Sequence, residues 1–278
     1  MQRIDDSSID RGANEPWYVM TRASQRDRYQ RALNLATLDR WRPKDAYDVG
    51  CANGQFASRL AGLGVSVVGM DINQDRIHQN QAEHENTPNL SFRHADFLTA
   101  GTAAGSADLV CALEVIYYFS EEEERRFLER AWEVLRPGGR LLLSVNIFFT
   151  SHISEESLCA KVSEKFQILK IDKIYRSLYY RMELPLIELL DQIKYLENLR
   201  IFSPAILSVN RTFYPGVWNT ILLRPSVTLD RIILPGVRFL ALRLLGSDLL
   251  YKGITGLTRM FWPRKGKSQM IIIAEKKQ

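Results

Sequence analysis

The stretch that most constrains the fold is residues 46–54, which read Ala-Tyr-Asp-Val-Gly-Cys-Ala-Asn-Gly. An apolar strand ends at Val49, two glycines bracket a tight turn, and an apolar helical pattern follows at once. Glycine lets the backbone approach a ligand closely, so this arrangement predicts a nucleotide-type site in an α/β sheet. The spacing D-x-G-x-x-x-G is not the G-x-G-x-x-G of dinucleotide sites. The negative charge of Asp48 would repel a pyrophosphate, so this position suits a ligand with a cationic end.

Two further strands are predicted to end in acids. A strand over 65–70 runs into Asp71, 21 residues after the first glycine, where a carboxylate can accept both hydroxyls of a ribose. A strand over 90–93 leads to Asp96 and Phe97. An acid followed by an aromatic can bind the amino group of an adenine and stack on its ring.

The next segments extend the same pattern. A strand over 108–113 runs into Glu114, at the crevice where open sheets bind ligands. After a helix with an acidic start come residues 135–139, Leu-Arg-Pro-Gly-Gly, and a strand over 140–145. This alternation of strands and helices predicts a mostly parallel sheet.

The order of these motifs resembles the class I S-adenosylmethionine-dependent methyltransferases over about residues 15–175. The matching segments are Asp48-Val49-Gly50-Cys51-Ala52-Asn53-Gly54, Asp71, Asp96-Phe97, Glu114-Val115 and Leu135-Arg136-Pro137-Gly138-Gly139. Residues 114–119, with Pro16-Trp17 and Tyr29 upstream, are similar more narrowly to the nodulation N-methyltransferase and its relatives. The resemblance implies a doubly wound, mostly parallel seven-stranded sheet of Rossmann-like type, with an antiparallel edge strand. About 90 residues separate the last two predicted strands where a short turn would do, so a large helical insertion is predicted before the last strand.

The resemblance also implies a cofactor, S-adenosyl-L-methionine, and a set of site residues. The predicted cofactor-binding residues are Trp17, Asp48, Gly50, Cys51, Ala52, Gly54, Asp71, Ile72, Asp96, Phe97 and Glu114. The predicted catalytic residues are Glu114, Tyr117 and His152. Ala52 stands where the family usually has the middle glycine of G-x-G-x-G, a departure that narrows the loop slightly.

Each site residue has a structural alternative. Asp71 could instead cap the helix that begins near Asn73, and Asp96 could also be a cap. Phe97 and Tyr117 could be core aromatics. No Cys/His cluster has metal-ligand spacing, so no metal is predicted. Two rival classes stay open: a non-catalytic cofactor-binding or scaffold protein, and a nicotinamide dehydrogenase. The dehydrogenase is disfavoured because the turn lacks the third glycine of the G-x-G-x-x-G fingerprint.

The chain is predicted to fall into three parts. Residues 1–14 are expected to be disordered, residues 15–175 and 268–278 form the methyltransferase domain, and residues 176–267 form an insertion. The insertion holds 14 Lys/Arg and 6 Asp/Glu, a net charge of +8, whereas the remaining 23 and 26 give −3. This asymmetry indicates a local anionic partner.

The insertion has three interpretations: a helical lid over the active site, a membrane-surface platform, or a nucleic-acid-binding segment. Arg231, Arg238 and Arg243 beside aliphatic and aromatic residues suit anionic lipid heads. Nucleic acid is disfavoured because the basic residues alternate with aliphatic bulk. The longest uncharged run there, residues 212–223, has 12 residues, short of the ~20 that span a bilayer.

The remaining expectations concern substrate and location. Three cysteines without a framework spacing, and a polar N-terminus without an apolar leader, predict a cytoplasmic protein that is not secreted and has no transmembrane helix. Association with the inner face of the membrane is an added option. The predicted reaction transfers a methyl group to oxygen or nitrogen of a sugar, glycolipid or lipid-linked intermediate, with a soluble metabolite as the alternative.

Overall fold

The structure is a computed structural model, and it describes residues 22–147, 153–201, 234–263 and 266–277. The chain divides into two units. The first contains Met1–Asp10, Asp27–Ser177 and Thr255–Gln278, and the second contains Arg11–Arg26 and Leu178–Ile254. The predicted disorder of residues 1–14 lies outside the described residues, and the predicted domain limits at 176 and 267 stay a prediction.

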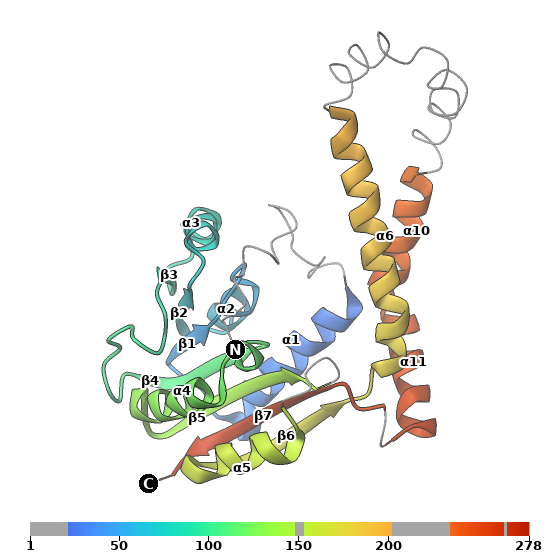
Figure 1. Cartoon of the computed structure of the whole chain (residues 1–278). Coiled ribbons are helices and arrows are strands. Elements are labelled where there is room, and N and C mark those ends of the chain that lie inside the picture. The colour runs from blue at the N-terminus through green and yellow to red at the C-terminus, as the bar shows by residue number, and fades with distance from the viewer. Residues whose placement is uncertain (1–21, 148–152, 202–233, 264–265, 278) are drawn as a thin grey trace, which may run out of the picture. The chain divides into compact units, whose positions relative to one another are not determined.

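The first unit is built on one seven-stranded sheet with the strand order β3-β2-β1-β4-β5-β7-β6 (Figure 1). The strands are β1 (Asp45–Val49), β2 (Ser66–Asp71), β3 (Leu90–His94), β4 (Ala107–Leu113), β5 (Leu135–Asn146), β6 (Phe166–Ile174) and β7 (Gln269–Lys276). β1 to β5 pair in parallel, and β7 pairs antiparallel with both β5 and β6. The predicted doubly wound, mostly parallel seven-stranded sheet is therefore observed.

The last two strands form the predicted antiparallel pair at the sheet edge, with β6 outermost and β7 between β5 and β6. β7 contributes an unbroken buried run from Met270 to Ala274, which needs neighbours on both sides. β6 carries Lys170, Asp172 and Lys173 along its length and takes the edge position. Charged residues on an edge strand oppose pairing with another chain. The charged sequence of β6 therefore suits the edge, and the apolar sequence of β7 suits the inner position.

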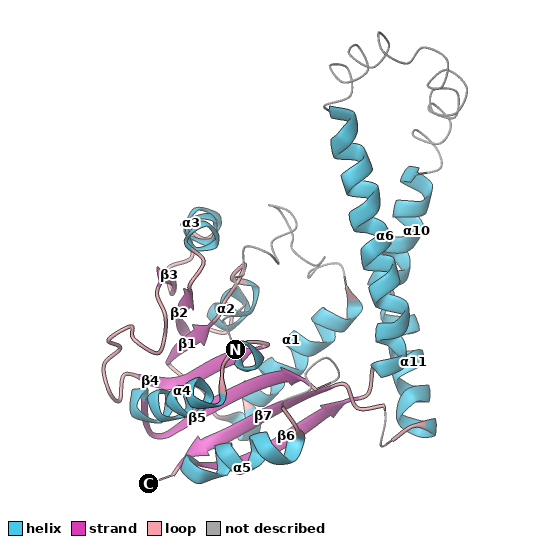
Figure 2. Cartoon of the chain, viewed as in Figure 1, coloured by secondary structure: helices cyan, strands magenta, loops and turns pink. Residues whose placement is uncertain are grey.

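Helices connect these strands and cover the sheet (Figure 2). They are α1 (Ala23–Ala36), α2 (Gln55–Ala61), α3 (Gln74–Glu83), α4 (Glu121–Val134) and α5 (Glu155–Lys165), with short 3-10 turns η3 (Leu38–Arg40) and η4 (Ile116–Tyr118). α4 begins with a capping box, in which Ser120 and Glu123 satisfy each other's backbone N–H groups. Phe127 of α4 and Val162 of α5 share one apolar core with Leu141 and Ile272 of the sheet. α1 contacts α2 through the Tyr29 and Phe56 rings, 5.9 Å apart.

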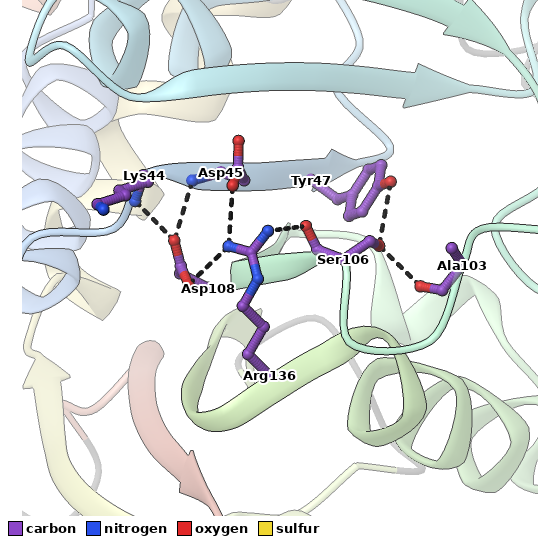
Figure 3. Close-up of polar contacts among 7 residues, drawn as sticks. All are labelled: Lys44, Asp45, Tyr47, Ala103, Ser106, Asp108 and Arg136. Atoms are coloured by element: carbon purple, nitrogen blue, oxygen red, sulfur yellow. Dashed lines mark hydrogen bonds and ion pairs between the residues drawn. The ribbon is translucent and has the colours of Figure 1, made fainter.

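A network of ion pairs and hydrogen bonds links the strands at the edge of the sheet where the parallel strands begin (Figure 3). Arg136 donates to Asp45 at 2.8 Å, to Asp108 at 2.9 Å and to the Ser106 carbonyl at 2.9 Å. Asp108 also accepts the Lys44 and Asp45 amides. Burial alone would raise the pKa of Asp108, but Arg136 and the two amides outweigh it and lower that pKa. Every oxygen of Asp108 therefore has a donor.

The second unit is helical in its described part. It holds most of α6 (Ser177–Ile201), α10 (Leu234–Gly246) and the start of α11 (Asp248–Phe261). Ile187 and Leu190 of α6 pack against Ala241 and Leu245 of α10. A second cluster joins Tyr179 and Tyr251, whose rings meet edge to face at 4.9 Å. Within the described residues, no helix is both long enough and apolar enough to cross a membrane.

Candidate cofactor site

The glycine turn after β1 is held tightly against β2. The amides of Gly50 and Cys51 both donate to the Met70 carbonyl, at 2.8 and 3.0 Å. Gly50 and Gly54 have φ of +66° and +68°, in the left-handed region that favours glycine. A Cβ on Gly50 would also lie 2.4 Å from Cγ2 of Val115, which follows β4. The predicted glycine loop is therefore required both by its backbone angle and by its close approach to a neighbouring strand end.

Ala52 also has a positive φ, +46°, which is uncommon for a residue with a side chain. Two hydrogen bonds hold it there. Its amide donates to Oδ2 of Asp71 at 2.9 Å, and its carbonyl accepts from the buried Asn80 side chain at 2.7 Å. Asn80 belongs to α3, so both the strand and the helix that follow the turn fix its shape. The alanine in place of the family's middle glycine is accommodated in this way.

Asp71 ends β2 with a buried carboxylate that faces the turn. The alternative assignment as a helix cap does not hold, because Asn73 caps α3 by accepting the Arg76 amide. Each Asp71 oxygen accepts one backbone amide, from Ala52 and from Asn73. An ionised carboxylate oxygen has two acceptor positions, so both oxygens keep capacity for hydroxyl donors.

Asp48 is the most perturbed carboxyl at this edge. It is buried, and its Oδ2 has no hydrogen-bond partner. The pKa of Asp48 is raised to about 7, chiefly by burial; the Ala57 amide and Arg28 oppose the rise, and the Asp71 charge adds to it. An orphaned buried carboxylate is costly unless a ligand completes it. A cationic ligand group would fit this position and would favour the charged form of Asp48.

Glu114 follows β4 in a strained conformation, with a φ of +63°. Its Oε1 accepts Ser144 Oγ at 2.6 Å and the Gln269 side-chain amide, and lies 3.8 Å from the Arg28 guanidinium. Burial raises the pKa of the neighbouring Tyr117 well above its ordinary value, and the Glu114 charge adds to the effect. Glu114 is therefore anchored by two hydrogen-bond donors and one ion pair, and Tyr117 stays neutral at physiological pH.

Arg28, Ser144 and Gln269 were not predicted as site residues. Arg28 lies on α1 with its guanidinium buried, and its Nε has no partner. Gln269 begins β7 and also donates to Ser144 Oγ at 3.0 Å. An arginine within an apolar helical pattern was the one available signal for Arg28. Ser144 and Gln269 lie 30 and 155 residues from Glu114, and no local pattern marks them.

The other predicted residues divide in two. Ile72 is exposed directly after Asp71, and Cys51 lies buried in the turn; their predicted contacts with a cofactor stay a prediction. Asp96 accepts the Leu98 amide at 3.0 Å, and Phe97 packs in the core against Phe127, 5.6 Å away. The core position of Phe97 speaks against the stacking role predicted for it.

Two predicted residues, Trp17 and His152, lie outside the described residues. In the part of the chain that the structure describes, no cluster of His, Cys, Asp or Glu could hold a metal ion. The site residues that can be placed come from the ends of β1, β2 and β4, with α1 beside them. This is the carboxyl edge of the parallel strands, where open α/β sheets bind ligands.

Comparison with known proteins agrees with this geometry. Residues 46–139 match the family model described as a methyltransferase domain. The chain is 26% identical over 146 residues to a phosphoethanolamine N-methyltransferase of Triticum aestivum, covering 52% of the chain and 29% of the relative. It is 30% identical over 137 residues to the O-antigen chain terminator bifunctional methyltransferase/kinase WbdD of Escherichia coli, covering 46% and 18%. The chain thus spans less than a third of the length of these relatives.

Solved structures show the same fold. The N-methyltransferase NodS from Bradyrhizobium japonicum WM9, in complex with S-adenosylhomocysteine, superposes with a TM-score of 0.54 at 22% identity, over 60% of the chain and 88% of NodS. The [4+2]-cyclase SpnF superposes with a TM-score of 0.52 at 15% identity, over 91% and 82%. Residues 46–139 therefore match a methyltransferase domain, and the predicted class I methyltransferase fold is confirmed.

Proposed function

We propose that this chain, which carries a class I S-adenosylmethionine-dependent methyltransferase domain, transfers a methyl group to a nitrogen or oxygen of a small molecule. The observation that carries the proposal is the buried, unpartnered carboxylate oxygen of Asp48 beside a glycine turn with no room for a Cβ. A fold alone does not establish chemistry, as the cyclase with the same fold illustrates. The chemistry has to follow from the residues of the site.

The residues of the strand ends fit the parts of the cofactor. Asp48 would accept hydrogen bonds from the amino group of its methionine moiety, and the buried Arg28 guanidinium would pair with the adjacent carboxylate. Asp71 would accept the ribose hydroxyls, and exposed Ile72 would cover the adenine. When bound, the cofactor supplies an electrophilic methyl group on a sulfonium. The protein then has mainly to hold the acceptor in line with it and to exclude water.

The anchoring of Glu114 favours a nitrogen acceptor over a hydroxyl. A hydroxyl acceptor needs a base, whereas an amine needs only to be neutral. Oε1 of Glu114 is already engaged by Ser144, Gln269 and Arg28. Burial raises the pKa of Tyr117, so its hydroxyl keeps its proton at neutral pH and cannot take one from an acceptor. Both residues instead support the site: Glu114 orders Arg28 and the β4 end, and Tyr117 offers a neutral hydroxyl.

For the acceptor we favour an amine-bearing sugar, glycolipid or lipid-linked intermediate. The support is the basic and apolar character of residues 176–267, with a net charge of +8, which suits an anionic, amphipathic molecule as lid or platform. Relatives named for phosphoethanolamine and for O-antigen chain termination are consistent with a phosphorylated amine or a glycan. A soluble metabolite is the second candidate, since small acceptors are compatible with the same site.

Titration calorimetry with S-adenosylhomocysteine tests the site directly. Asp71→Ala should weaken binding by about 2–3 kcal/mol, because two ribose hydroxyls would lose a charged acceptor. Asp108→Ala, at the opposite edge of the sheet, is the matched control and should bind with wild-type affinity. Equal affinities for wild type and Asp71→Ala would remove Asp71 from the site. Cofactor binding without methyl transfer to any amine or hydroxyl of a glycolipid extract would favour the non-catalytic rival.

A further inference from the structure

Four large apolar side chains are exposed together at the end of α11. The exposed fractions are 48% for Leu257, 63% for Met260, 61% for Phe261 and 52% for Trp262. The first three stand at helical positions i, i+3 and i+4, so they share one face, and the Phe261 and Trp262 rings lie 6.0 Å apart. We call these four residues the α11 patch. Contiguous exposed apolar groups of this size mark an interaction surface.

The patch is held in a fixed position on the first unit. The Trp262 amide donates to the Thr258 carbonyl at 2.9 Å, and the Gly266 amide donates to the Trp262 carbonyl at 2.7 Å. The Arg259 guanidinium lies 5.7 Å from the centre of the Tyr175 ring, just after β6. The two hydrogen bonds order the end of α11, and the Arg259–Tyr175 contact joins it to the end of β6, so its apolar side chains are presented by a structured element.

The patch is also connected to the edge of the sheet that carries the cofactor site. Seven residues after Trp262, Gln269 begins β7, opposite Asn146 at the end of β5. The Ile147 amide donates to the Ser268 carbonyl at 2.9 Å, and Gln269 itself bonds Glu114 and Ser144. A surface that bound the α11 patch would therefore meet the same edge of the sheet as the acceptor.

The charges beside the patch identify the kind of surface. Between residues 249 and 263 the charged side chains are Lys252 and Arg259, and both are exposed. They stand on one flank of the apolar face. An exposed apolar helix face with cations on its flank and a tryptophan at its end is typical of helices that lie in the interface of an anionic membrane.

We propose that the α11 patch inserts into the headgroup region of an anionic membrane and turns the cofactor edge of the first unit toward the lipid. This proposal rests on the proposed function, because it supplies the route by which a lipid-linked acceptor reaches the site. It differs from charge-driven docking through the arginines of the insertion. The main contribution comes from apolar burial of Met260, Phe261 and Trp262, and the cations orient the helix.

Co-sedimentation with vesicles of phosphatidylcholine and phosphatidylserine, compared with phosphatidylcholine alone, tests the proposal. The wild type should pellet with the anionic vesicles at low salt and keep most of its binding in 1 M salt, where the Debye length is ~3 Å. The triple variant Met260→Ser/Phe261→Ser/Trp262→Ser should lose about 1000-fold in partitioning, since each of the three buried apolar side chains contributes about tenfold. Leu63→Ser removes an equally exposed leucine elsewhere and should bind vesicles as the wild type does.

Three outcomes would overturn the proposal. One is a triple variant that pellets as the wild type does. Another is a variant Phe239→Ser/Leu240→Ser, altered at the exposed apolar pair of α10, that loses more binding than the triple variant. The third is a wild type that ignores vesicles but elutes as a dimer that the triple variant converts to a monomer, which would assign the patch to a second copy of the chain.

The S-adenosylhomocysteine titration separates this proposal from the proposed function. Equal affinities of wild type and triple variant would show that the variant is folded with an intact site. A wild type that binds vesicles but not S-adenosylhomocysteine would support the membrane proposal and contradict the proposed function. A wild type that binds S-adenosylhomocysteine but not vesicles would contradict the membrane proposal and leave the proposed function intact.

Discussion

The two edges of the sheet use the same residue types with opposite results. At the edge where the parallel strands begin, Asp45, Asp108 and Arg136 satisfy one another. At the edge where they end, Asp48 has an oxygen without a partner and Arg28 has an Nε without one. The pKa of Asp108 is lowered, whereas that of Asp48 is raised to about 7.

This difference separates groups that stabilise the fold from groups that await a ligand. Buried polar groups are normally paired, and those that are not mark sites where strain or incompleteness serves function. The left-handed conformations of Ala52 and Glu114 lie at the same edge as the orphaned atoms. Asp39 and Arg40 also have positive φ, before β1, so a strained backbone alone does not mark the site; at the carboxyl edge it occurs together with unpaired buried atoms.

The largest effect is expected for Gly50→Val. A Cβ there would lie 2.4 Å from Val115, and the φ of +66° adds about 1–2 kcal/mol of strain for any residue with a side chain. The turn must move, so S-adenosylhomocysteine binding should fall by more than about 1000-fold. Gly138→Val is the matched control at the opposite edge, because its φ is +74° but no atom lies within 4 Å of its Cβ position.

Gly138→Val should therefore lose some thermal stability and keep its cofactor affinity. Calorimetry and thermal melting of both variants make the comparison. If Gly138→Val lost cofactor affinity as Gly50→Val does, backbone strain anywhere in the sheet would explain the result, and the close approach at Gly50 would have no special role.

The second effect is a pH dependence set by Asp48. Its folded-state pKa of about 7 is above the ordinary 3.8, so between these values the native state binds a proton that the unfolded state has released. The stability contribution of Asp48 therefore falls as pH rises through this window, by up to about 4 kcal/mol. Asp48→Asn should match the wild type near pH 4 and exceed it increasingly toward pH 8, measured by urea unfolding without cofactor.

The same variant should bind S-adenosylhomocysteine at least about tenfold more weakly at pH 8, because the amide cannot pair with a cationic amino group. A variant that gains no stability with rising pH would show that Asp48 titrates normally. A variant that gains stability and keeps full affinity would show that the orphaned oxygen serves something other than this ligand.

The smallest effect is expected for Asp108→Asn, and its sign is opposite. The pKa of Asp108 is lowered in the folded protein, so its stabilising contribution is present above the unfolded pKa and lost as pH falls through the folded value. The variant should be less stable than the wild type at pH 7 by at most about 1 kcal/mol, since the network is partly exposed to solvent. The deficit should vanish at low pH, and cofactor affinity should not change. A deficit that persists at low pH would contradict this assignment.

Local patterns in the sequence were sufficient for most of the fold. The glycine turn, the acids after three strands and the alternation of strands and helices are each written in neighbouring residues. Parallel strands bring their carboxyl ends to one edge, so the meeting of Asp48, Asp71 and Glu114 could be predicted before any contact was known. The same logic located Gly50 and Gly54, because a strand-to-helix turn needs left-handed backbone at fixed places.

What the tertiary structure decided is which of these groups have partners. Arg28 meets Glu114 only when the helix before the first strand packs beside the end of β4. Gln269 meets it only when β7 enters the sheet between β5 and β6. The core position of Phe97 and the raised pKa of Asp48 likewise depend on burial by distant segments. Residue types and spacing are local properties of a chain, but burial and pairing arise from contacts between segments far apart in it, and these contacts decide which groups can still bind a ligand.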